Sequence, residues 1–474
     1  MKTLERQHSP SSKQSEKISI LPIDMQASLP LFCIAVTAGK WKPYDHSVFV
    51  AEAVQKAMET PGSRVILEIP PRHGKTYTSI VYGGAWYLKN WPGKTFAYVA
   101  HTQSLADKYS EKCRLVFESL PYGQGLAADS RAKQNWSTAG LGGGFFSTGV
   151  GGPVTGIGFD FMAVDDPVKN QEEAYSAVYR DKTYAYYTDT LRDRMQPGGS
   201  ILLIMQRWHE DDLAGRLIKD GGWDVIRLPA LAEEEDPLGR GPGAALCPQM
   251  FDVGALNALK KDMGSKTFEA KYQQNPIHLS GAMFKPEWFR YFDLETDRLT
   301  FPDGKKILLS ECRIFQTVDP AGTEGKLSDY FVCGTFAQDR NNNLYLLDIA
   351  RTKAETTRHA EILRQTRDRW QPYAQYVENK VFGINAIQNA KKDGMPVRKL
   401  EADRSKVLRA EEAVTFYENA MIYHRRNAPW LAALEDELPQ FPNGEHDDQV
   451  DVVSYAAIIA RQRATTNWRE KYLR

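Results

Sequence analysis

The chain of 474 residues is too long for one ordinary hydrophobic core, so two or three domains are expected. Its 42% hydrophobic and 25% charged residues are typical of folded globular proteins. Because 60 basic residues are balanced by 60 acidic ones, the composition excludes an overall basic surface, and any contact with nucleic acid has to come from local patches.

Cysteines and apolar runs restrict the class of protein further. The five cysteines are scattered and form no C-x-x-C pair, which argues against a disulfide framework or a zinc site and favours a reducing compartment. The apolar run 29–38 is too short to span a bilayer. We interpret it as a buried helix or strand and expect no membrane partner.

The first half of the chain has the pattern of a parallel sheet. Residues 1–20 are polar and aperiodic and predict a disordered N-terminal arm, whose boundary we place at residue 40. Residues 41–230 then alternate apolar strand-like runs with helical stretches, which favours parallel strands flanked by helices. The expected strands are 64–69, 95–100, 161–164, 200–206 and 223–228, and the expected helices are 76–89, 104–119 and 172–194.

A different pattern follows in the second half. Residues 232–248 are rich in Pro, Gly and acidic residues, so we expect a linker or lid region over 231–305, with short helices near 253–262 and 266–274. A second α/β domain is expected over 306–460, followed by a tail over 461–474. Its elements are an antiparallel meander of strands at 313–319, 331–338 and 344–350, a helix at 355–370 and a strand at 374–379.

Residues 64–76 read RVILEIPPRHGKT, an apolar strand, a sharp turn and a helix start. Gly74, Lys75 and Thr76 fill the second half of the phosphate-binding pattern G-x-x-x-x-G-K-[ST], whereas Ile69 replaces its first glycine. In such loops backbone N–H groups and a helix N-terminus hold a polyphosphate. We expect Lys75 against the terminal phosphates and the Thr76 hydroxyl on Mg²⁺; a chance surface turn is the alternative.

Two further strands end in polar residues. The segment FMAVDDP ends in Asp165, a candidate for holding Mg²⁺, and Asp166, a candidate base for the attacking water. The alternative for this pair is a helix N-cap. The segment SILLIMQRWHEDDL ends with Gln206 and Arg207, which in a parallel sheet would lie beside the phosphate site and sense the γ-phosphate. Strand-end surface chemistry is the alternative there.

Four segments together resemble the large terminase subunit of tailed bacteriophages, the ATP-driven motor that packages viral DNA. They are IPPRHGKT, GVGGPVTGIGFDFMAVDDPVKN, IMQRWHEDDLAGRL and KYQQNP. The resemblance runs from about Trp41 to Ala456. It implies an α/β fold with a P-loop ATPase domain of the ASCE type around a parallel sheet, followed by a ribonuclease-H-like nuclease domain. The deviant loop, with arginine ahead of Gly-Lys, is common in this family.

The resemblance also implies roles within the ATPase domain. Arg72 becomes a candidate catalytic arginine, and Pro71 and His73 become loop residues that bind ATP. His46, with Tyr44 and Asp45, lies where the family contacts adenine, although a helix start is equally compatible.

Two positions depart from the family pattern. Gln206 stands where relatives often have Thr, and Ile157 stands where they often have a basic residue. An arginine acting in trans is expected in a ring motor. The candidates left for it are Arg180, Arg192 and Arg194.

A second group of acids occupies the ends of elements in the C-terminal block. Asp319 ends a strand, Glu378 lies near the end of another, and Asp448 opens a helix, where acids are favoured electrostatically. Acids that crowd together without a cation cost stability, and a metal pair is the usual resolution. The set predicts two Mg²⁺ or Mn²⁺ ions for phosphodiester hydrolysis; separate caps and solvated acids are the alternative.

The order of these acids resembles the ribonuclease-H-like nuclease half of terminases. That resemblance implies Asp319, Glu378 and Asp448 as core catalytic ligands, with support from Asp329, Asp447 and Asp451, and leaves open whether Asp447 or Asp448 is the primary one. A basic stretch beside the acids is the candidate for contacts with the DNA backbone, or else a solvated helical face. It comprises Lys380, Lys391, Lys392, Arg398, Lys399, Arg404, Lys406 and Arg409.

The expected function is that of a viral packaging motor. ATP hydrolysis with Mg²⁺ would drive double-stranded DNA into a procapsid, and the metal-dependent endonuclease would cut concatemeric DNA. The resemblance implies three partners, namely the portal, a small terminase subunit and further copies of the chain in a pentameric ring, and it implies action in the cytoplasm of the infected bacterial host. The alternatives are an ATP-dependent helicase or repair nuclease, expected to show further helicase motifs, and a scaffold with degenerate sites, which the intact acids and Lys75 disfavour.

Overall fold

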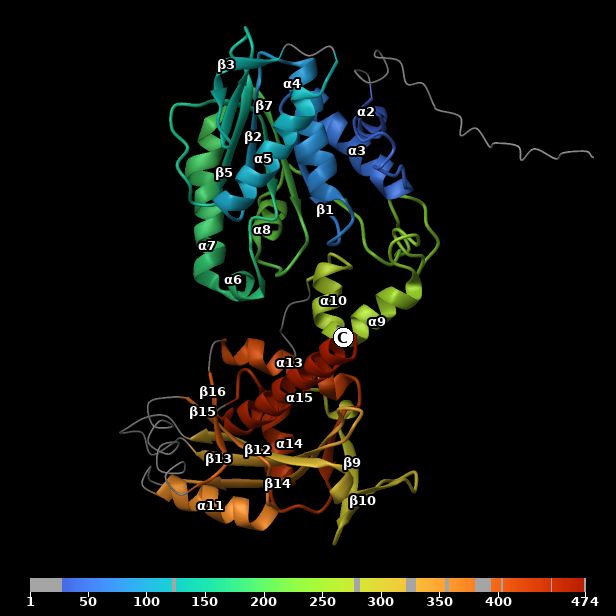
Figure 1. Ribbon diagram of the computed structural model, residues 1–474, viewed down its shortest axis with the longest axis vertical. Helices are drawn as coiled ribbons and strands as arrows, with labels where there is room; N and C mark the ends of the chain where they lie inside the picture. Colours follow the sequence, from blue (N-terminus) through green and yellow to red (C-terminus); the bar gives the residue numbers. More distant parts are fainter. Residues whose placement is uncertain are drawn as a thin grey trace, which may run out of the picture. The chain divides into compact units, whose positions relative to one another are not determined.

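The computed structural model describes residues 28–121, 125–276, 282–320, 330–353, 358–379, 394–401, 404–444 and 446–472. The chain divides into two compact units. The first comprises the residues up to Lys169 together with Asp181–Gln206 and Leu213–Met250, and the second comprises Asn170–Arg180, Arg207–Asp212 and the residues from Phe251 onward. Each unit is built around one sheet with helices on its faces (Figure 1), which confirms the predicted α/β class.

The sheet of the first unit has eight strands in the order β3-β4-β5-β2-β6-β7-β1-β8. From β5 to β8 all neighbours are parallel, whereas β3 and β4 extend the β5 edge in antiparallel fashion. The strands are β1 (Arg64–Glu68), β2 (Thr95–Ala100), β3 (Leu126–Arg131), β4 (Asn135–Thr138), β5 (Gly144–Gly149), β6 (Phe159–Asp165), β7 (Met195–Met205) and β8 (Asp224–Arg227).

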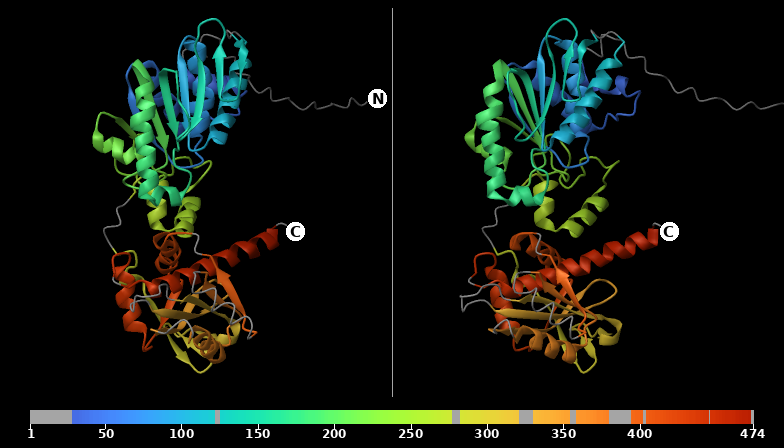
Figure 2. Two further views of the ribbon diagram at one scale, coloured as in Figure 1. Left: turned by 90° about the vertical axis from the view of Figure 1, so that its left-hand side faces the viewer. Right: turned by 60° about the vertical axis from the view of Figure 1, so that its left-hand side comes forward.

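Alternating side chains of these strands enter two separate cores. On β7, Leu202 and Ile204 enter one core while Ile201 and Leu203 enter the other. Figure 2 shows the helices that cover the two faces of this sheet. One face is covered by α2 (Leu29–Val36), α3 (Asp45–Glu59), a π-helical turn (Tyr77–Tyr82), α4 (Gly83–Asn90) and α5 (Gln103–Glu118), and the other by the end of α7 (Ala177–Tyr186), a second π-helical turn (Tyr187–Leu191) and α8 (Leu213–Asp220).

The N-terminal boundary differs from the expected one. The apolar run near residue 30 forms α2, and its Leu29, Phe32 and Cys33 are buried in the core of the first unit. These residues therefore belong to that unit and not to an arm ending at residue 40. The edge strands β3 and β4 were not predicted, because LAADSR and NWST are short and carry few apolar side chains.

The sheet of the second unit has nine strands in the order β11-β10-β9-β17-β14-β13-β12-β15-β16. Its centre is the predicted antiparallel meander of β12, β13 and β14, and parallel strands flank it on both sides. The strands are β9 (Arg290–Glu295), β10 (Arg298–Thr300), β11 (Lys306–Leu308), β12 (Arg313–Pro320), β13 (Phe331–Gln338), β14 (Leu344–Thr352), β15 (Gln375–Glu378), β16 (Val397–Leu400) and β17 (Ile422–Arg425).

The segment expected as a linker is divided between the two units. Residues up to Met250 belong to the first unit and those from Phe251 to the second. The expected short helices are present as α9 (Val253–Met263) and α10 (Ser265–Lys271). Strand β9 joins the sheet by pairing with β17, which lies more than 120 residues further along the chain, and such distant pairing leaves no local trace in the sequence.

Helices cover both faces of the second sheet (Figure 1). Helix α11 (His359–Trp370) packs Leu363 against Val318 and Val377 on one face. Helices α13 (Lys406–Glu418), α14 (Leu431–Gln440) and α15 (Asp448–Tyr472) pack on the other. In the part of the chain that the structure describes, no helix is long and apolar enough to cross a membrane. All five cysteines are free.

Two candidate catalytic sites

The predicted phosphate loop connects β1 to the π-helical turn at Tyr77. Ile69, at the position of the missing glycine, is fully buried and extends the pairing of β1 with β7 by donating its N–H to Met205 O at 3.2 Å. The left-handed positions come later, at Arg72 (φ 67°) and Gly74 (φ 78°). A Cβ at Gly74 would meet no atom within 4 Å, so backbone conformation and not space favours glycine there. Arg72 lies exposed in the loop, in a conformation that is strained for a non-glycine residue.

Lys75 is paired with the second of the two predicted aspartates. Its Nζ lies 2.7 Å from Asp166 Oδ2, and the Lys75 side chain is only 8% exposed. Asp166 has φ 41°, and its Oδ1 accepts the backbone N–H of Gln206 at 3.0 Å. The ends of β1, β6 and β7 thus bring Lys75, Asp166 and Gln206 together, as expected for adjacent parallel strands.

Asp165 is the buried member of the aspartate pair. Burial raises the pKa of its carboxyl to about 7, the charge of Asp166 raises it further, and Lys75 and a hydrogen bond with Thr76 oppose the shift. Its Oδ1 is buried without a hydrogen-bond partner among the described residues. A buried carboxylate oxygen beside a threonine hydroxyl suits a hydrated Mg²⁺, so these residues fit the expected ion.

Two histidines lie at the side of the loop. The ring of His46, from α3, contacts that of His73 edge-on at 5.4 Å and stacks on Tyr44 at 6.0 Å. Burial lowers the pKa of His46 to about 4, and the neighbouring His73 lowers it further; burial also lowers the pKa of His73. Both rings are therefore neutral near pH 7. His46 Nδ1 is buried without a partner in the described residues, a polar atom available to a ligand.

Arg207 does not extend this group of polar residues. Its Nε lies 3.0 Å from both carboxylate oxygens of Asp212, and its N–H donates to Gln274 Oε1 at 2.9 Å, all within the second unit. Both side chains of the Arg207–Asp212 pair are buried. The expectation that Arg207 binds ATP therefore differs from the structure, where a buried ion pair holds its guanidinium. Gln206, by contrast, lies beside Asp166, and its Oε1 is buried without a partner among the described residues.

The candidates for an arginine in trans differ in exposure. Arg180 donates to Asp211 at 3.1 Å and to Ala174 O at 3.0 Å, which holds it within its own chain. Arg192 is exposed in the short 3-10 turn Arg192–Arg194. Exposure favours Arg192 over Arg180 for a contact with another subunit.

The second candidate site begins with two acids on neighbouring strands. Parallel β12 and β15 pair Val318 with Val377, so Asp319 and Glu378, each one residue further on, lie side by side on the same face. That face is the one toward α15, because Thr317 donates to Val452 O at 2.8 Å and Tyr455 donates to Glu378 Oε1 at 2.8 Å. Both acids are buried. The register of the sheet therefore brings these two predicted acids together.

The N-terminus of α15 adds acids above this pair. Asp451 is one turn before Tyr455 on the same helix face and is buried. Asp448 lies toward α14: burial raises the pKa of Asp448 to about 6, followed by the charges of Glu437 and Asp447. Glu437 accepts the backbone N–H of Gln449 at 2.7 Å. Of the two α15 acids, Asp451 is the one tied to Glu378, through the shared contact described next.

Two basic residues of α13 are bound to these acids. Arg409 Nη2 lies 2.6 Å from Asp451 Oδ1 and 3.9 Å from Glu378 Oε1. Lys406 Nζ lies 2.6 Å from Asp447 Oδ1 and 3.2 Å from Asp451 Oδ2. Sequence reasoning had assigned both residues to DNA contacts. Arg409 is buried and paired, so it is not available to a phosphate backbone.

The predicted metal set is not assembled in the described residues. Among them, no group of three or more His, Cys, Asp and Glu side chains is arranged to hold a metal ion. Asp329 lies outside the described residues, so the structure does not place this predicted ligand. Asp319 and Glu378 supply suitable oxygen donors, but Asp447 and Asp451 face basic side chains instead of a third ligand position. The described arrangement therefore does not fit a bound metal pair.

The remaining basic residues are dispersed. Lys380, Lys391 and Lys392 lie outside the described residues. Arg398 is exposed near the rings of Tyr373 and Tyr376, at 5.9 and 5.7 Å. Lys399 and Arg404 are also exposed and remain candidates for phosphate contacts.

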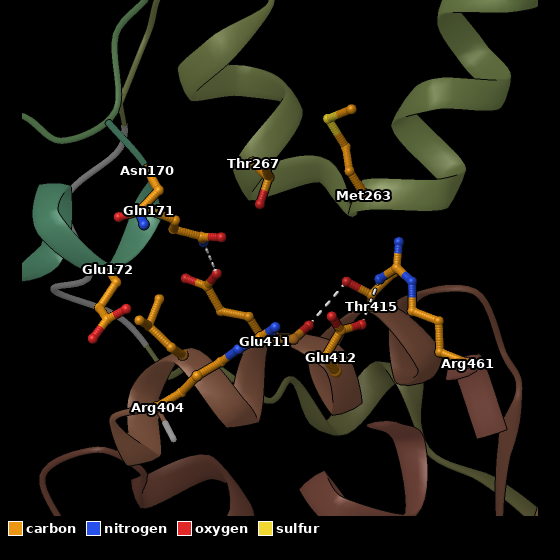
Figure 3. A pocket seen from close by; sticks show the side chains of 11 residues that line it. Asn170, Gln171, Glu172, Met263, Thr267, Arg404, Glu411, Glu412, Thr415 and Arg461 are labelled. Atoms are coloured by element: carbon orange, nitrogen blue, oxygen red, sulfur yellow. Dashed lines mark hydrogen bonds and ion pairs between the residues drawn. The ribbon is translucent and has the colours of Figure 1, made fainter. Parts of the chain in front are cut away.

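A polar cavity of about 360 Å³ lies in the second unit, on the side of α13 that carries Leu408, Glu411 and Glu412 (Figure 3). Its carboxylates are already paired: Glu411 binds Lys266 at 2.5 Å and Gln171, and Glu412 binds Arg461. A ligand would have to displace these partners, so the cavity is a poor candidate for the catalytic site. Opposite sides of α13 thus face this cavity and the acids.

Comparison with known proteins identifies the second unit. Residues 316–459 match the family described as the terminase RNaseH-like domain. Among curated proteins, no sequence matches the chain.

Several solved structures are similar to the chain. One is the large terminase of a thermophilic bacteriophage, at 12% identity over 88% of this chain and 99% of that one, with a TM-score of 0.48. The HK97 bacteriophage large terminase is similar at 10% identity over 88% and 95%, with a TM-score of 0.34. The large terminase nuclease of thermophilic phage G20c with bound magnesium is similar at 14% identity over 38% and 98%, with a TM-score of 0.28. The family match over residues 316–459 confirms the resemblance to terminase large subunits that the sequence motifs predicted.

Proposed function

We propose that the chain is an ATP-driven packaging subunit that moves double-stranded phage DNA into a procapsid and also cuts it. The observation that carries the ATPase half is the buried pairing of Lys75 with Asp166 beside the unpartnered Asp165 Oδ1. A buried cation and two carboxylates at the ends of neighbouring parallel strands form an arrangement that a nucleoside triphosphate with its cation would complete. The terminase RNaseH-like family of the second unit supports the nuclease half.

In this proposal Lys75 leaves Asp166 to bind the terminal phosphates of ATP. Asp166, freed from Lys75, then orients the attacking water and accepts its proton on a carboxylate oxygen. Thr76 and Asp165 would hold Mg²⁺, which when bound neutralises charge on the phosphates. Arg72, exposed in the loop, is proposed to stabilise charge on the leaving phosphate, and Pro71 and His73 shape the loop. His46 Nδ1 is proposed to contact the base, and Gln206 Oε1 to contact the attacking water.

In the nuclease half, Asp319 and Glu378 are proposed to be the central acids of phosphodiester cleavage. Their adjacency on β12 and β15 supports this assignment. Asp448, Asp447, Asp451 and Asp329 are proposed as supporting acids, and two Mg²⁺ or Mn²⁺ ions as cofactors. Because the described acids do not form a metal group, we assign no individual step to them beyond binding the divalent cations.

The proposed partners are double-stranded DNA, a portal on the procapsid, a small terminase subunit and further copies of this chain in a ring. The family match to a terminase domain supports this setting, as does its consequence that the chain acts in the cytoplasm of an infected bacterium. Arg192 is the proposed arginine for a neighbouring active site, since it is exposed.

A pair of variants tests both halves. Lys75→Ala is expected to abolish ATP hydrolysis and spare cation-dependent DNA cleavage, and Asp319→Ala is expected to do the reverse. Both activities are measured on the purified full chain with plasmid DNA. If each variant kept both activities, the two site assignments would be wrong. ATP-dependent DNA uptake into procapsids, without strand separation, distinguishes the packaging motor from a helicase or repair nuclease.

A further inference from the structure

Arg409 is the most enclosed charged side chain near the acids of the second unit. Its side chain is only 5% exposed, although it projects from α13 toward a cluster of acids. Four groups surround its guanidinium: Asp451 Oδ1 at 2.6 Å, Glu378 Oε1 at 3.9 Å, the backbone oxygen of Arg404 at 2.9 Å and the ring of Tyr455, whose centre is 5.0 Å away. One planar cation therefore connects β15, α13 and α15.

These contacts close a ring of interactions. Tyr455, which lies under the guanidinium, donates its own hydroxyl to Glu378 Oε1 at 2.8 Å. The same carboxylate oxygen is thus approached by Tyr455 and by Arg409, while Asp451, one turn before Tyr455, binds the same guanidinium. Moving either acid breaks a contact of the other. A rigid fork of donors suits this task better than a single ammonium.

Lys406, one turn earlier on α13, contacts the same acids in a different way. Its side chain is 39% exposed, and it binds Asp447 and Asp451 without further partners among the described contacts. A half-exposed ammonium on a flexible stem can leave at small cost, since exposed ion pairs contribute only ~0.2–1 kcal/mol. Arg409 and Lys406 therefore share Asp451 but differ in how firmly each is held.

We propose that Arg409 is a positioning residue that fixes Glu378 against Asp451, and that Lys406 is an exchangeable counter-ion that a divalent cation displaces from Asp447 and Asp451. This inference rests on the proposed nuclease function and explains why the described acids form no metal group. Arg409 prepares the site for the cation by holding strand and helix in register. Lys406 competes with the cation for the same oxygens and becomes free for a phosphate once it is displaced.

The two roles predict opposite changes in cation affinity. Arg409→Lys keeps the charge but loses the fork, and is expected to weaken Mn²⁺ binding by about 10- to 100-fold, the usual effect of losing a residue that orients metal ligands. Lys406→Gln removes the competitor, and is expected to tighten Mn²⁺ binding by about two- to fivefold. Arg404→Lys is the matched control, because only its backbone oxygen takes part.

Mn²⁺ binding is measured on the full chain by isothermal titration calorimetry, with thermal unfolding in EDTA as the check on folding. Cleavage against Mn²⁺ concentration is the second readout. If Arg409→Lys does not fold, Tyr455→Phe replaces it, since that variant loosens the same carboxylate and is expected to weaken Mn²⁺ binding too.

Opposite shifts for the Arg409 and Lys406 variants, with no shift for the control, support the inference. Equal shifts in the same direction, or an unchanged affinity in Arg409→Lys, overturn it while leaving the nuclease function intact. A wild-type chain that neither binds Mn²⁺ nor cuts DNA overturns the proposed nuclease function itself, and this inference with it.

Discussion

The two candidate sites solve a similar electrostatic problem with different parts. In the first unit, Lys75 neutralises Asp166 beside the buried Asp165, and all three lie at the ends of adjacent parallel strands. In the second unit, Arg409 and Lys406 neutralise acids that come from β12, β15 and the start of α15. One site is built at a single sheet edge; the other requires a helix to be held at a set height above a sheet.

This difference has a physical consequence. Parallel strands fix the relative height of their ends through the hydrogen-bond ladder, so the first site depends mainly on pairing within one sheet. The second site depends additionally on side-chain packing between α15 and β12 or β13, where small changes in volume shift a helix. We therefore expect the second site to be more sensitive than the first to changes in the core.

The largest expected effect concerns Asp165. Asp165→Asn keeps the shape of the side chain and removes its charge, so kcat for ATP hydrolysis is expected to fall by about 10²- to 10³-fold. Since burial raises the pKa of Asp165, the neutral amide is not expected to lower the melting temperature at pH 8. Steady-state ATPase assays and calorimetry check both points. A parallel loss of DNA cleavage would contradict the separation of the two sites.

A pair of glycine variants tests the sensitivity of the two sites directly. A Cβ at Gly334, on β13, would lie 2.8 Å from Phe336 Cε2 and 3.3 Å from Val452 Cγ2 of α15. A Cβ at Gly84, on α4, would lie 3.0 Å from both Cys113 Sγ and Phe145 Cε2. Each alanine variant is expected to lose about 1–3 kcal/mol of unfolding free energy by overpacking.

Only Gly334→Ala is expected to lower catalysis per folded molecule, because it displaces the helix that carries Asp448 and Asp451. Gly84→Ala is the matched control, with ATP hydrolysis per folded molecule close to that of the wild type. Urea titrations give the stabilities and active-site-normalised rates give the activities. Equal loss of both activities in both variants would show that the sites do not differ in this respect.

The smallest expected effect is the acid sensitivity of the first site. The folded-state pKa of His46 is lowered to about 4 by burial, so below pH 6.5 the unfolded chain binds a proton that the folded chain does not. Stability from this group is complete above pH 6.5 and falls as the pH drops toward 4, by about 1 kcal/mol at pH 6. His46→Gln is expected to lose less stability than the wild type between pH 8 and pH 6, measured by urea unfolding. A slope equal to that of the wild type would mean that His46 does not titrate as its burial predicts.

Several elements could be predicted from local pattern alone. The strands β1, β2, β6, β7 and β8 are continuous apolar runs between helices, and the meander β12–β14 has the alternation and turn residues of antiparallel strands. The candidate acids and Lys75 could be named because they follow directly on such runs. The division of residues 231–305 and the strands β9 and β17 could not, because their pairing joins segments far apart in the sequence.

The sequence by itself determined which residues carry the chemistry: the Gly-Lys-Thr loop, the paired aspartates after β6 and the ordered acids of the second unit. Their residue types and positions at element ends are local properties, and local properties can be read from a chain. Only the tertiary structure decided which acids lie together and what neutralises them. Asp319 lies beside Glu378 because of strand register, Arg207 is bound by Asp212, and Arg409 contacts Asp451 and Glu378 instead of solvent. Such pairings follow from how sheets and helices pack, since burying a charge requires a partner that only the folded chain supplies.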